Sequence, residues 1–445
     1  MKAFLNRLII IIFCILPVGL RAMNNYADNK LIIIPTAEQL LISHNLTEGV
    51  YVRTLGYYKE NDGGGGLFKI QKTKPAKSET VLYYSLPNGL YANCMDFEVV
   101  LPRYGGVYVN QMLENAKPFL RPGIRDVIVL PPSNANHPGC SNYISGSGSR
   151  ICFWQVNAPV LFDDRCSYSE VYLHDELVVA SEVDEIEAVL KIAGKDKPED
   201  ITFVSPVLVG GRHLDKKNTI VAEHAVLIED GARIIFGKLQ AGFAKNCITL
   251  GGGQYSNEVE FYANFIEAGS CLERGLNIED DKRVISFNIE KMHLQAPIGR
   301  NITWLYAHGN LTQSNIGTFF CTILSASKVG TTYKVFDIET MSKSSQVIDF
   351  DRIRISQCSD FGTISGGVYN LGTLYLTATP EEDINVQIGQ NTTVICDYIQ
   401  MANPIGNNWK VTGKGPSSVL QVNVCNNPPK QIINSVVTVV NKQKL

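Results

Sequence analysis

Two adjacent carboxylates, Asp280 and Asp281, are the side chains in this sequence best suited to acid–base chemistry. Closely placed carboxylates push their pKa values apart, so that one stays protonated as an acid while the other is ionised. Such a pair can cleave a glycosidic bond by general acid and base catalysis. His308 and Arg352 follow at separations of 27 and 44 residues, and a guanidinium suits bidentate contact with an anionic sugar. The four residues form a candidate catalytic group.

The same residues also have a purely structural interpretation. Asp280 and Asp281 then mark a corner of the chain, His308 caps a turn, and Arg352 pairs with Asp349. Aromatic side chains raise a similar choice, because their apolar faces match the C–H faces of pyranose rings, while packing in a core is the alternative. The candidate substrate-binding residues are Tyr255, Tyr262, Trp304, Tyr306 and Arg354.

The cysteines do not predict a metal site or a cofactor. Eleven are scattered along the chain without C-x-x-C spacing, so a zinc site is not expected. Only the cysteines at 140, 152 and 166 lie close enough in sequence to suggest a local disulfide. Four others lie in apolar, β-rich runs and are expected to be buried free thiols. These are Cys247, Cys321, Cys358 and Cys396.

A further acidic pair, in "FDDRC" (Phe162–Cys166), is expected to form a turn, with cation binding as the alternative. Overall charge excludes other partners. The 445 residues carry 40 basic and 43 acidic side chains, and no basic cluster is longer than a pair. Nucleic-acid-binding proteins and proteins held on anionic lipids concentrate basic residues, so neither partner is expected.

The first 22 residues have the layout of an export signal. Two basic residues precede thirteen largely apolar residues, Leu8–Leu20, and Ala22 ends the segment. A helix of that length rises about 20 Å, too little for a hydrocarbon core of about 30 Å. Residues 1–22 are therefore expected to be a signal peptide or hydrophobic leader, with Met23 as an alternative start of the chain.

Nearly everything after residue 200 predicts short β-strands separated by Gly, Asn and Asp, too closely spaced for βαβ units. "IEDGARIIF" (Ile228–Phe236) recurs as "IEDDKRVISF" (Ile278–Phe287), and "RVISFN" recurs as "QVIDFD" (Gln346–Asp351). The intervals of 50 and 63 residues divide into coils of about 21 to 25 residues, a solenoid period, although chance similarity is the alternative. We expect stacked coils over about residues 200–400, with three pairs in related inward ladders: Ile234/Ile235, Val284/Ile285 and Val347/Ile348.

Helical periodicity is confined to Tyr108–Leu120 and Ser181–Gly194, the second with residues that resemble caps at both ends. Upstream, "GYYKENDGGGGLFKI" (Gly56–Ile70) places an Asp-Gly turn signal and four consecutive glycines between two strand-like runs. Glycine suits positive φ and the close approach of two backbones. A hairpin is therefore expected here, with a flexible surface turn as the alternative.

The glycine segment, "LPNGLYAN" (Leu86–Asn93), the short helix and "IRDVIVLPPS" (Ile124–Ser133) together resemble the head of pectin-lyase-like right-handed parallel β-helix proteins. Members of that superfamily, phage tailspikes among them, often carry G-x-x-x-x-x-D-G-G-G-x-F-x-I followed by A-N-G-L-Y-A. The resemblance implies an all-β fold, a right-handed parallel β-helix with a small N-terminal β cap and a helix that plugs its open end. The F-G-A-x-G-D-G-x-x-D-D-T motif that often precedes this helix is absent here.

The resemblance also implies an organisation for the chain. After the leader at 1–22, a head region covers 23–135, the β-helix covers 136–425 and a tail covers 426–445. "IEDD", "YAHGN" and "DRIRI" follow the order of the acidic, G-H-G and R-I-K motifs of polygalacturonases. The first N-x-D motif of that family is missing, Ala307 replaces a glycine, and Arg354 replaces the lysine.

These features together predict an exported or virion-associated protein that binds a bacterial surface or extracellular polysaccharide. Whether it also cleaves the polymer, as a hydrolase or a lyase, is left open, and a non-enzymatic structural or adhesive β-helix is the alternative. The leader favours a secreted, periplasmic or cell-surface location, while the head motif favours a phage virion. Because tailspikes are commonly trimeric, a homotrimer is also left open.

Overall fold

The structure is a computed structural model, and it divides the chain into two compact units, Met1–Phe97 and Glu98–Leu445, which are described separately. For some residues within strands, 280–283 among them, only the backbone is described. No described helix is both long and apolar enough to cross a membrane. The description covers residues 30–442 except 122–124, 131–139, 145–149, 174–176, 195–198, 214–215, 217–218, 253–257, 296–297, 312–313, 323–331, 341–346, 359, 379–383, 403–408, 416 and 427–428.

The first unit is a five-stranded sheet in the order β1-β2-β3-β5-β4. The pair β1–β2 is parallel, and the remaining pairs are antiparallel. Val52, Phe68, Ile70 and Ala92 have no exposed surface and form its core. The helix α2 follows β1, and the Thr36 hydroxyl caps it by accepting the Gln39 N–H at 3.2 Å. The elements are β1 (Leu31–Thr36), α2 (Ala37–Leu41), β2 (Tyr51–Gly56), β3 (Gly66–Gln71), β4 (Tyr83–Ser85) and β5 (Tyr91–Cys94).

The expected hairpin joins β2 to β3, and a buried carboxylate organises its loop. Asp62 has no exposed surface, and its carboxylate accepts the backbone N–H groups of Tyr57 and Tyr58 at 2.8 Å, Lys59 at 3.2 Å and Gly64 at 2.9 Å. Gly63 has a φ of +86°, and a Cβ at Gly65 would lie 2.8 Å from the Thr54 carbonyl oxygen. Glycines are therefore needed for the loop to fold over the carboxylate and against β2.

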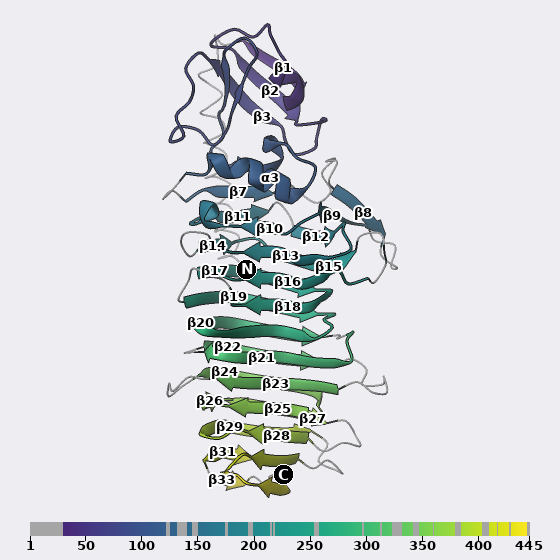
Figure 1. Cartoon of the computed structure of the whole chain (residues 1–445), viewed down its shortest axis with the longest axis vertical. Coiled ribbons are helices and arrows are strands. Elements are labelled where there is room, and N and C mark those ends of the chain that lie inside the picture. The colour runs from purple at the N-terminus through teal and green to yellow at the C-terminus, as the bar shows by residue number, and fades with distance from the viewer. Residues whose placement is uncertain are drawn as a thin grey trace, which may run out of the picture. The chain divides into compact units, whose positions relative to one another are not determined.

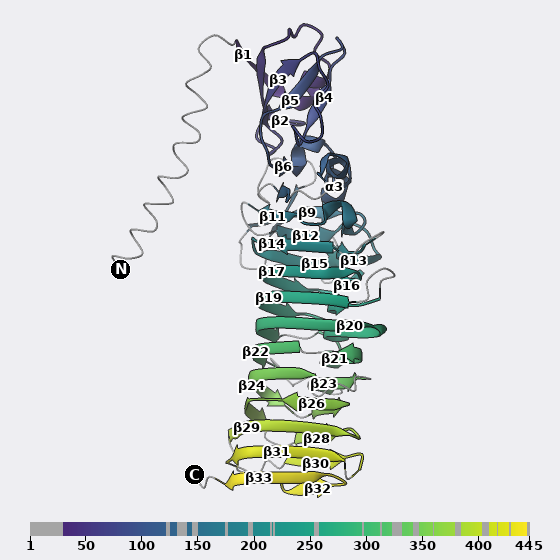
Figure 2. The same ribbon diagram turned by 90° about the vertical axis from the view of Figure 1, so that its left-hand side faces the viewer.

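The second unit is a 28-stranded sheet in which the strands pair in parallel, apart from the antiparallel pair β8–β9 (Figures 1 and 2). The pairings form three ladders. The first ladder contains β10 (Val160–Phe162), β13 (Ile186–Ile192), β16 (Ala222–Ile228), β18 (Ala244–Leu250), the start of β20 (Arg274–Gln295), β21 (Asn301–Leu311), β23 (Thr332–Thr340), β25 (Asp360–Ser365), β28 (Ile384–Ile388), β30 (Trp409–Gly413) and β32 (Gln431–Ile433).

Long strands run through both the second and the third ladder. The shared strands are β17 (Gly231–Gly242), β19 (Glu258–Gly269), the later part of β20, β22 (Ser314–Thr322), β24 (Ile348–Cys358), β29 (Thr392–Ala402), β31 (Ser418–Cys425) and β33 (Val436–Lys442). The second ladder adds β6 (Val99–Val100), β7 (Val127–Leu130), β11 (Glu170–Leu173), β14 (Glu199–Phe203) and β26 (Gly367–Asn370). The third adds β9 (Arg150–Val156), paired with β8 (Cys140–Ile144), and β12 (Leu177–Ser181), β15 (Val207–His213) and β27 (Thr373–Ala378).

Side chains of like kind stack along each ladder to make the core. Ile248, Leu276, Leu305 and Phe336 are consecutive partners in the first ladder and have no exposed surface. Phe203 and Phe236 are partners in the second, with ring centroids 4.4 Å apart in parallel planes. Each fully buried side chain of this size contributes about 1.5–3 kcal/mol. The stacked apolar columns therefore hold the ladders in register.

Short helices lie beside the first strands of the second unit. The expected helix within Tyr108–Leu120 is present as α3 (Val109–Ala116) followed by η2 (Lys117–Phe119). Its buried residues are Val109, Met112, Leu113 and Ala116, and it packs against β9 and β10. The acidic pair of "FDDRC" forms the expected turn, because Asp163 caps η3 (Asp164–Cys166) by accepting the Arg165 N–H. One further short helix, η1, spans Leu101–Tyr104.

The predicted helix at Ser181–Gly194 is wrong, because this segment contains strand β13. Ile186, Ala188, Leu190 and Ile192 are buried at alternate positions, and β13 pairs in parallel with β10 and β16. Pairing on both sides outweighs local helix propensity. Asp184, expected as a cap, instead forms an ion pair with Lys216.

The predicted inward ladders are correct in position but wrong in register. Ile234 aligns through Phe261 with Phe287, and Ile348 occupies the equivalent position beside Ser314. Ile285 lies two residues earlier, opposite Val259. The shift arises between Asp280 and Val284, where the pairing of β20 with β21 is irregular. Ile228 and Ile278 do share a column through Leu250, as the repeated "IED" suggested.

The intervals between equivalent residues are longer and less regular than expected. In the first ladder Thr249, Asn277, Tyr306, Asp337 and Thr363 are successive partners, roughly 26 to 31 residues apart rather than 21 to 25. The boundaries expected at 135/136 and 425/426 both lie inside the second unit. Strands β6 and β7 precede the first boundary and belong to the large sheet, while β32 and β33 follow the second and continue it.

Candidate functional site

The outward side chains of the first ladder converge because each strand has a pair of consecutive buried residues. In β21 the pair is Trp304–Leu305, and in β23 it is Val335–Phe336. Outward residues on either side of such a pair are three positions apart and approach each other. Arg274 Nη1 donates to Asn277 Oδ1 at 2.7 Å, and Lys334 Nζ lies 3.6 Å from Asp337 Oδ2. The ladder thus carries two neighbouring columns of polar side chains.

These columns form a continuous network across six strands, from β16 to β25. At its start, His224 Nδ1 lies 2.7 Å from Thr249 Oγ1, and Asn277 Nδ2 donates to the same oxygen at 3.4 Å. Burial lowers the pKa of His224, which keeps its imidazole neutral at ordinary pH. Asn277 then accepts the bond from Arg274, which also pairs with Glu279 at 2.9 Å.

Tyr306 and His308 continue the network on β21. The Arg274 guanidinium lies 3.5 Å from the centre of the Tyr306 ring, and the His308 ring stacks on it at 4.2 Å with an angle of 15°. Two groups this close to one ring centre must occupy opposite faces. Tyr306 therefore presents its hydroxyl and ring edge rather than the open face expected for stacking on a sugar. Burial raises the pKa of this hydroxyl, so it remains a donor.

Two carboxylates with different environments end the network. Asp337 Oδ1 lies 3.1 Å from His308 Nε2, and its other oxygen faces Lys334. Asp360, the partner of Lys334 on β25, accepts the Gly362 N–H at 2.8 Å. Burial raises the pKa of Asp360, and the nearby charge of Asp337 adds to this effect. The arrangement combines a carboxylate flanked by bases with a carboxyl group that holds its proton more tightly.

The residues of the predicted catalytic group do not all lie in this network. His308 belongs to it, and the backbone of Asp280 pairs with Gly309 beside it, but the side chains of Asp280 and Asp281 lie outside the described part. Arg352 is on β24, where it pairs with Thr318 and Thr373 in the third ladder. Strand register therefore brings Asp280 near His308 but puts Arg352 in another ladder.

The predicted aromatic group is likewise divided. Trp304 has no exposed surface and belongs to the core, so it is not available to a ligand. Tyr262 lies in the second ladder, where its hydroxyl donates to Glu260 at 3.1 Å, and Tyr255 lies outside the described residues. Arg354 lies in the third ladder, 5.4 Å from the Phe320 ring, which also contacts His293. Only Tyr306 of this group is in the network.

Several network residues were not singled out from the sequence. Arg274, Lys334, Asp337 and Asp360 are separated by intervals that vary from one strand to the next, which hides their alignment. A usable signal was present, because each strand repeats an outward polar residue, two apolar or small residues and a second outward polar residue. "TWLY" (Thr303–Tyr306) and "KVFD" (Lys334–Asp337) are examples.

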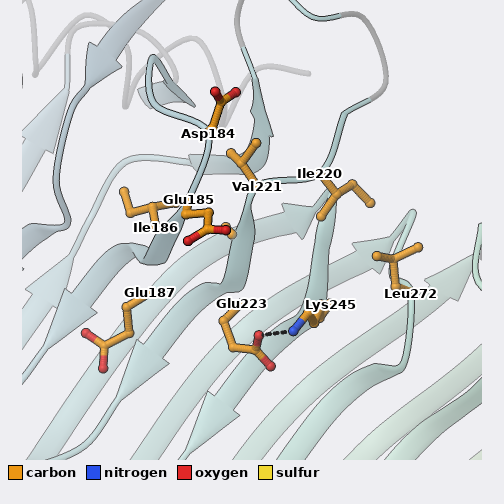
Figure 3. A pocket seen from close by; sticks show the side chains of 10 residues that line it. Asp184, Glu185, Ile186, Glu187, Ile220, Val221, Glu223, Lys245 and Leu272 are labelled. Carbon is orange, nitrogen blue, oxygen red and sulfur yellow. Dashed lines mark hydrogen bonds and ion pairs between the residues drawn. The ribbon is translucent and has the colours of Figure 1, made fainter.

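A pocket of about 570 Å³ opens at the beginnings of β13, β16 and β18, in the same ladder (Figure 3). Its carboxylates are held by lysines: Glu223 pairs with Lys245, and Glu187 with Lys191 at 2.9 Å. The pocket thus combines apolar side chains with a charged rim. It is lined by Asp184, Glu185, Ile186, Glu187, Ile220, Val221, Ala222, Glu223, Lys245 and Leu272.

Cysteines and metal ligands add no further site in the described part of the chain. Within it, no group of three or more His, Cys, Asp or Glu residues is placed to hold a metal ion. Cys166 is a buried free thiol and does not form the suggested local disulfide, while the side chains of Cys140 and Cys152 lie outside the description. The buried free thiols expected at 247, 321 and 396 are confirmed, and the side chain at 358 is not described.

Comparison of the chain with models of known protein families finds no match, and comparison with curated proteins finds none either.

Proposed function

We propose that the second unit is a right-handed parallel β-helix of the pectin-lyase-like kind, and that its first ladder binds a polysaccharide. The fold proposal is supported by three parallel ladders whose strands recur in chain order, with a helix beside the first of them. Parallel crossover connections are right-handed in about 98% of cases, which supports the handedness. The head motifs in the sequence agree with this fold.

The network from His224 to Asp360 is the observation that carries the binding proposal. Parallel strands are about 4.8 Å apart, so the ladder presents hydrogen-bonding groups in a row along the direction of stacking. A linear polymer rich in hydroxyl groups matches such a row over several strands. Arg274 and Lys334 are already paired with Glu279 and Asp337, so a dense polyanion would have to break these pairs. A hydroxyl-rich polymer of low charge is therefore the favoured ligand.

Binding should be measured by isothermal titration against a panel of bacterial capsular and extracellular polysaccharides. Arg274→Gln should weaken binding about tenfold or more, because charge-assisted hydrogen bonds contribute about 1.5–3 kcal/mol. Arg354→Gln is the matched control, since this exposed arginine lies in the third ladder. Equal loss in both variants, or no binding to any polysaccharide, would contradict the proposal and favour a structural or adhesive β-helix.

Cleavage of the bound polymer is a second candidate function, supported by the different environments of Asp337 and Asp360. A carboxyl group with a raised pKa suits a general acid, and an ionised neighbour suits a base. New reducing ends would indicate hydrolysis, and absorbance of an unsaturated product would indicate elimination. Asp337→Asn should abolish either activity, whereas Asp351→Asn, on the exposed surface of β24, should not. Unchanged cleavage by Asp337→Asn would exclude this pair.

The proposed location is outside the cytoplasm or in a virion. The segment Leu8–Leu20 supports export, and the head motif supports a spike. Sequencing the N-terminus of the native protein distinguishes them: removal of about 22 residues indicates export.

A further inference from the structure

The strand β1 forms an open, apolar edge of the first unit (Figure 1). Among the described residues it pairs only with β2. Leu31 and Ile33 are 55% and 62% exposed, and Pro35 is exposed on the same side. The strand carries no charged residue. Natural proteins protect an edge of this kind with charges, bulges or covering elements, because its backbone groups can pair with another strand.

The free edge has a defined set of donors and acceptors. The Lys30 carbonyl accepts the Tyr51 N–H at 3.2 Å, so even-numbered residues of β1 direct their backbone groups toward β2. The odd-numbered residues direct theirs outward. Leu31 and Ile33 therefore offer both an N–H and a C=O at the edge, whereas Pro35 offers only a C=O.

We propose that β1 is a self-association edge, which pairs antiparallel with β1 of a second copy of this chain. The outward-facing groups can pair with each other only if odd residues face odd residues. Pairing centred on Ile33 satisfies this condition, with Ile33 opposite Ile33 and Leu31 opposite Pro35 of the second copy. Each copy then donates from Leu31 and Ile33, and the missing N–H of Pro35 costs only one bond on each side.

Charge complementarity supports a second copy as the partner. Lys30 and Glu38 are exposed at opposite ends of β1. Because the two strands run in opposite directions, Lys30 of one copy lies beside the Thr36–Glu38 segment of the other. Two Lys30–Glu38 pairs then form, one on each side of the two-fold axis. The exposed Leu31 and Ile33 side chains of the two copies meet between them.

Sedimentation velocity on the full chain over a range of concentrations tests this proposal. The unmodified protein should be a reversible dimer. Ile33→Asp should be monomeric, because the two-fold axis places the new carboxylates directly opposite each other. Val204→Asp is the matched control, since Val204 is a 42% exposed aliphatic residue of the second unit, and this variant should remain dimeric. Circular dichroism confirms that each variant is folded.

A charge exchange gives a second, independent test. Lys30→Glu and Glu38→Lys should each weaken the dimer by about fivefold or more, since each converts two attractive pairs into repulsive ones. The double variant should restore the original affinity. A monomeric or trimeric wild-type protein would overturn the proposal. So would a dimer insensitive to Ile33→Asp and to the charge exchange, as association through Leu8–Leu20 would be.

Discussion

Replacing Asp163 by asparagine should loosen the helix that covers the first strands of the second unit. Lys117, at the end of α3, has a fully buried side chain, and its Nζ lies 3.2 Å from Asp163 Oδ2 and also contacts Glu114. Asp163 in turn accepts bonds from the backbone and the guanidinium of Arg165, the shortest at 2.6 Å. This cluster ties the helix to the turn after β10.

The magnitude follows from burial. Asp163→Asn leaves the Lys117 ammonium buried with only Glu114 as a counter-charge, and breaking a buried pair costs about 3–5 kcal/mol. Lys117→Met should cost less than about 1 kcal/mol, because Asp163 keeps its bonds to Arg165 and methionine fills the space with apolar atoms. The double variant should therefore be more stable than Asp163→Asn alone. Asp164→Asn, at the next position, should change stability by less than about 0.5 kcal/mol.

Hydrogen exchange of a peptide covering residues 109–116 is the appropriate assay, because the helix can open without unfolding the whole sheet. A loss of about 3 kcal/mol corresponds to exchange roughly 150-fold faster. If Asp163→Asn accelerates exchange no more than Asp164→Asn does, the ion cluster does not hold the helix. If the double variant is as unstable as the sum of both single variants, the buried ammonium is not the cause.

Three further predictions concern individual carboxylates. Burial opposes ionisation of Asp163, but the Arg165 hydrogen bonds and the Lys117 charge outweigh it and lower its pKa; its contribution to stability should therefore persist above about pH 4 and be lost as the pH falls further, measured as the urea midpoint against pH. Asp62→Asn should destabilise the first unit by about 2–3 kcal/mol, because an amide cannot accept four N–H groups, whereas the exposed Glu60→Gln should have no effect on thermal unfolding. Asp360 has a raised pKa, so it stabilises the fold less as the pH rises through that value; Asp360→Asn, which keeps an acceptor for Gly362, should raise the melting temperature at pH 7 and leave it nearly unchanged at pH 3.

Local signals in the sequence were sufficient where neighbouring residues determine structure. The Asp-Gly turn and the glycines predicted the β2–β3 hairpin, and the apolar period predicted α3. Parallel strand pairing was also predicted, because short apolar runs without helical crossovers leave few alternatives. The failures at Ser181–Gly194 and in the register of Val284 and Ile285 share a cause. Partners in these ladders are about one round of the chain away, and the length of each round is set by loops that carry no pairing signal.

The location of the network follows from the core rather than from any motif. Each buried pair, such as Val335–Phe336, adds a second side chain to the interior and turns the outward residues on either side, Lys334 and Asp337, toward each other. The polar columns are therefore a geometric consequence of packing, and any polar residues at these positions would converge. This explains why the sequence predicted the architecture better than the site. Apolar residues at inward positions are constrained by burial, while the identity of the outward residues is constrained only by what they bind.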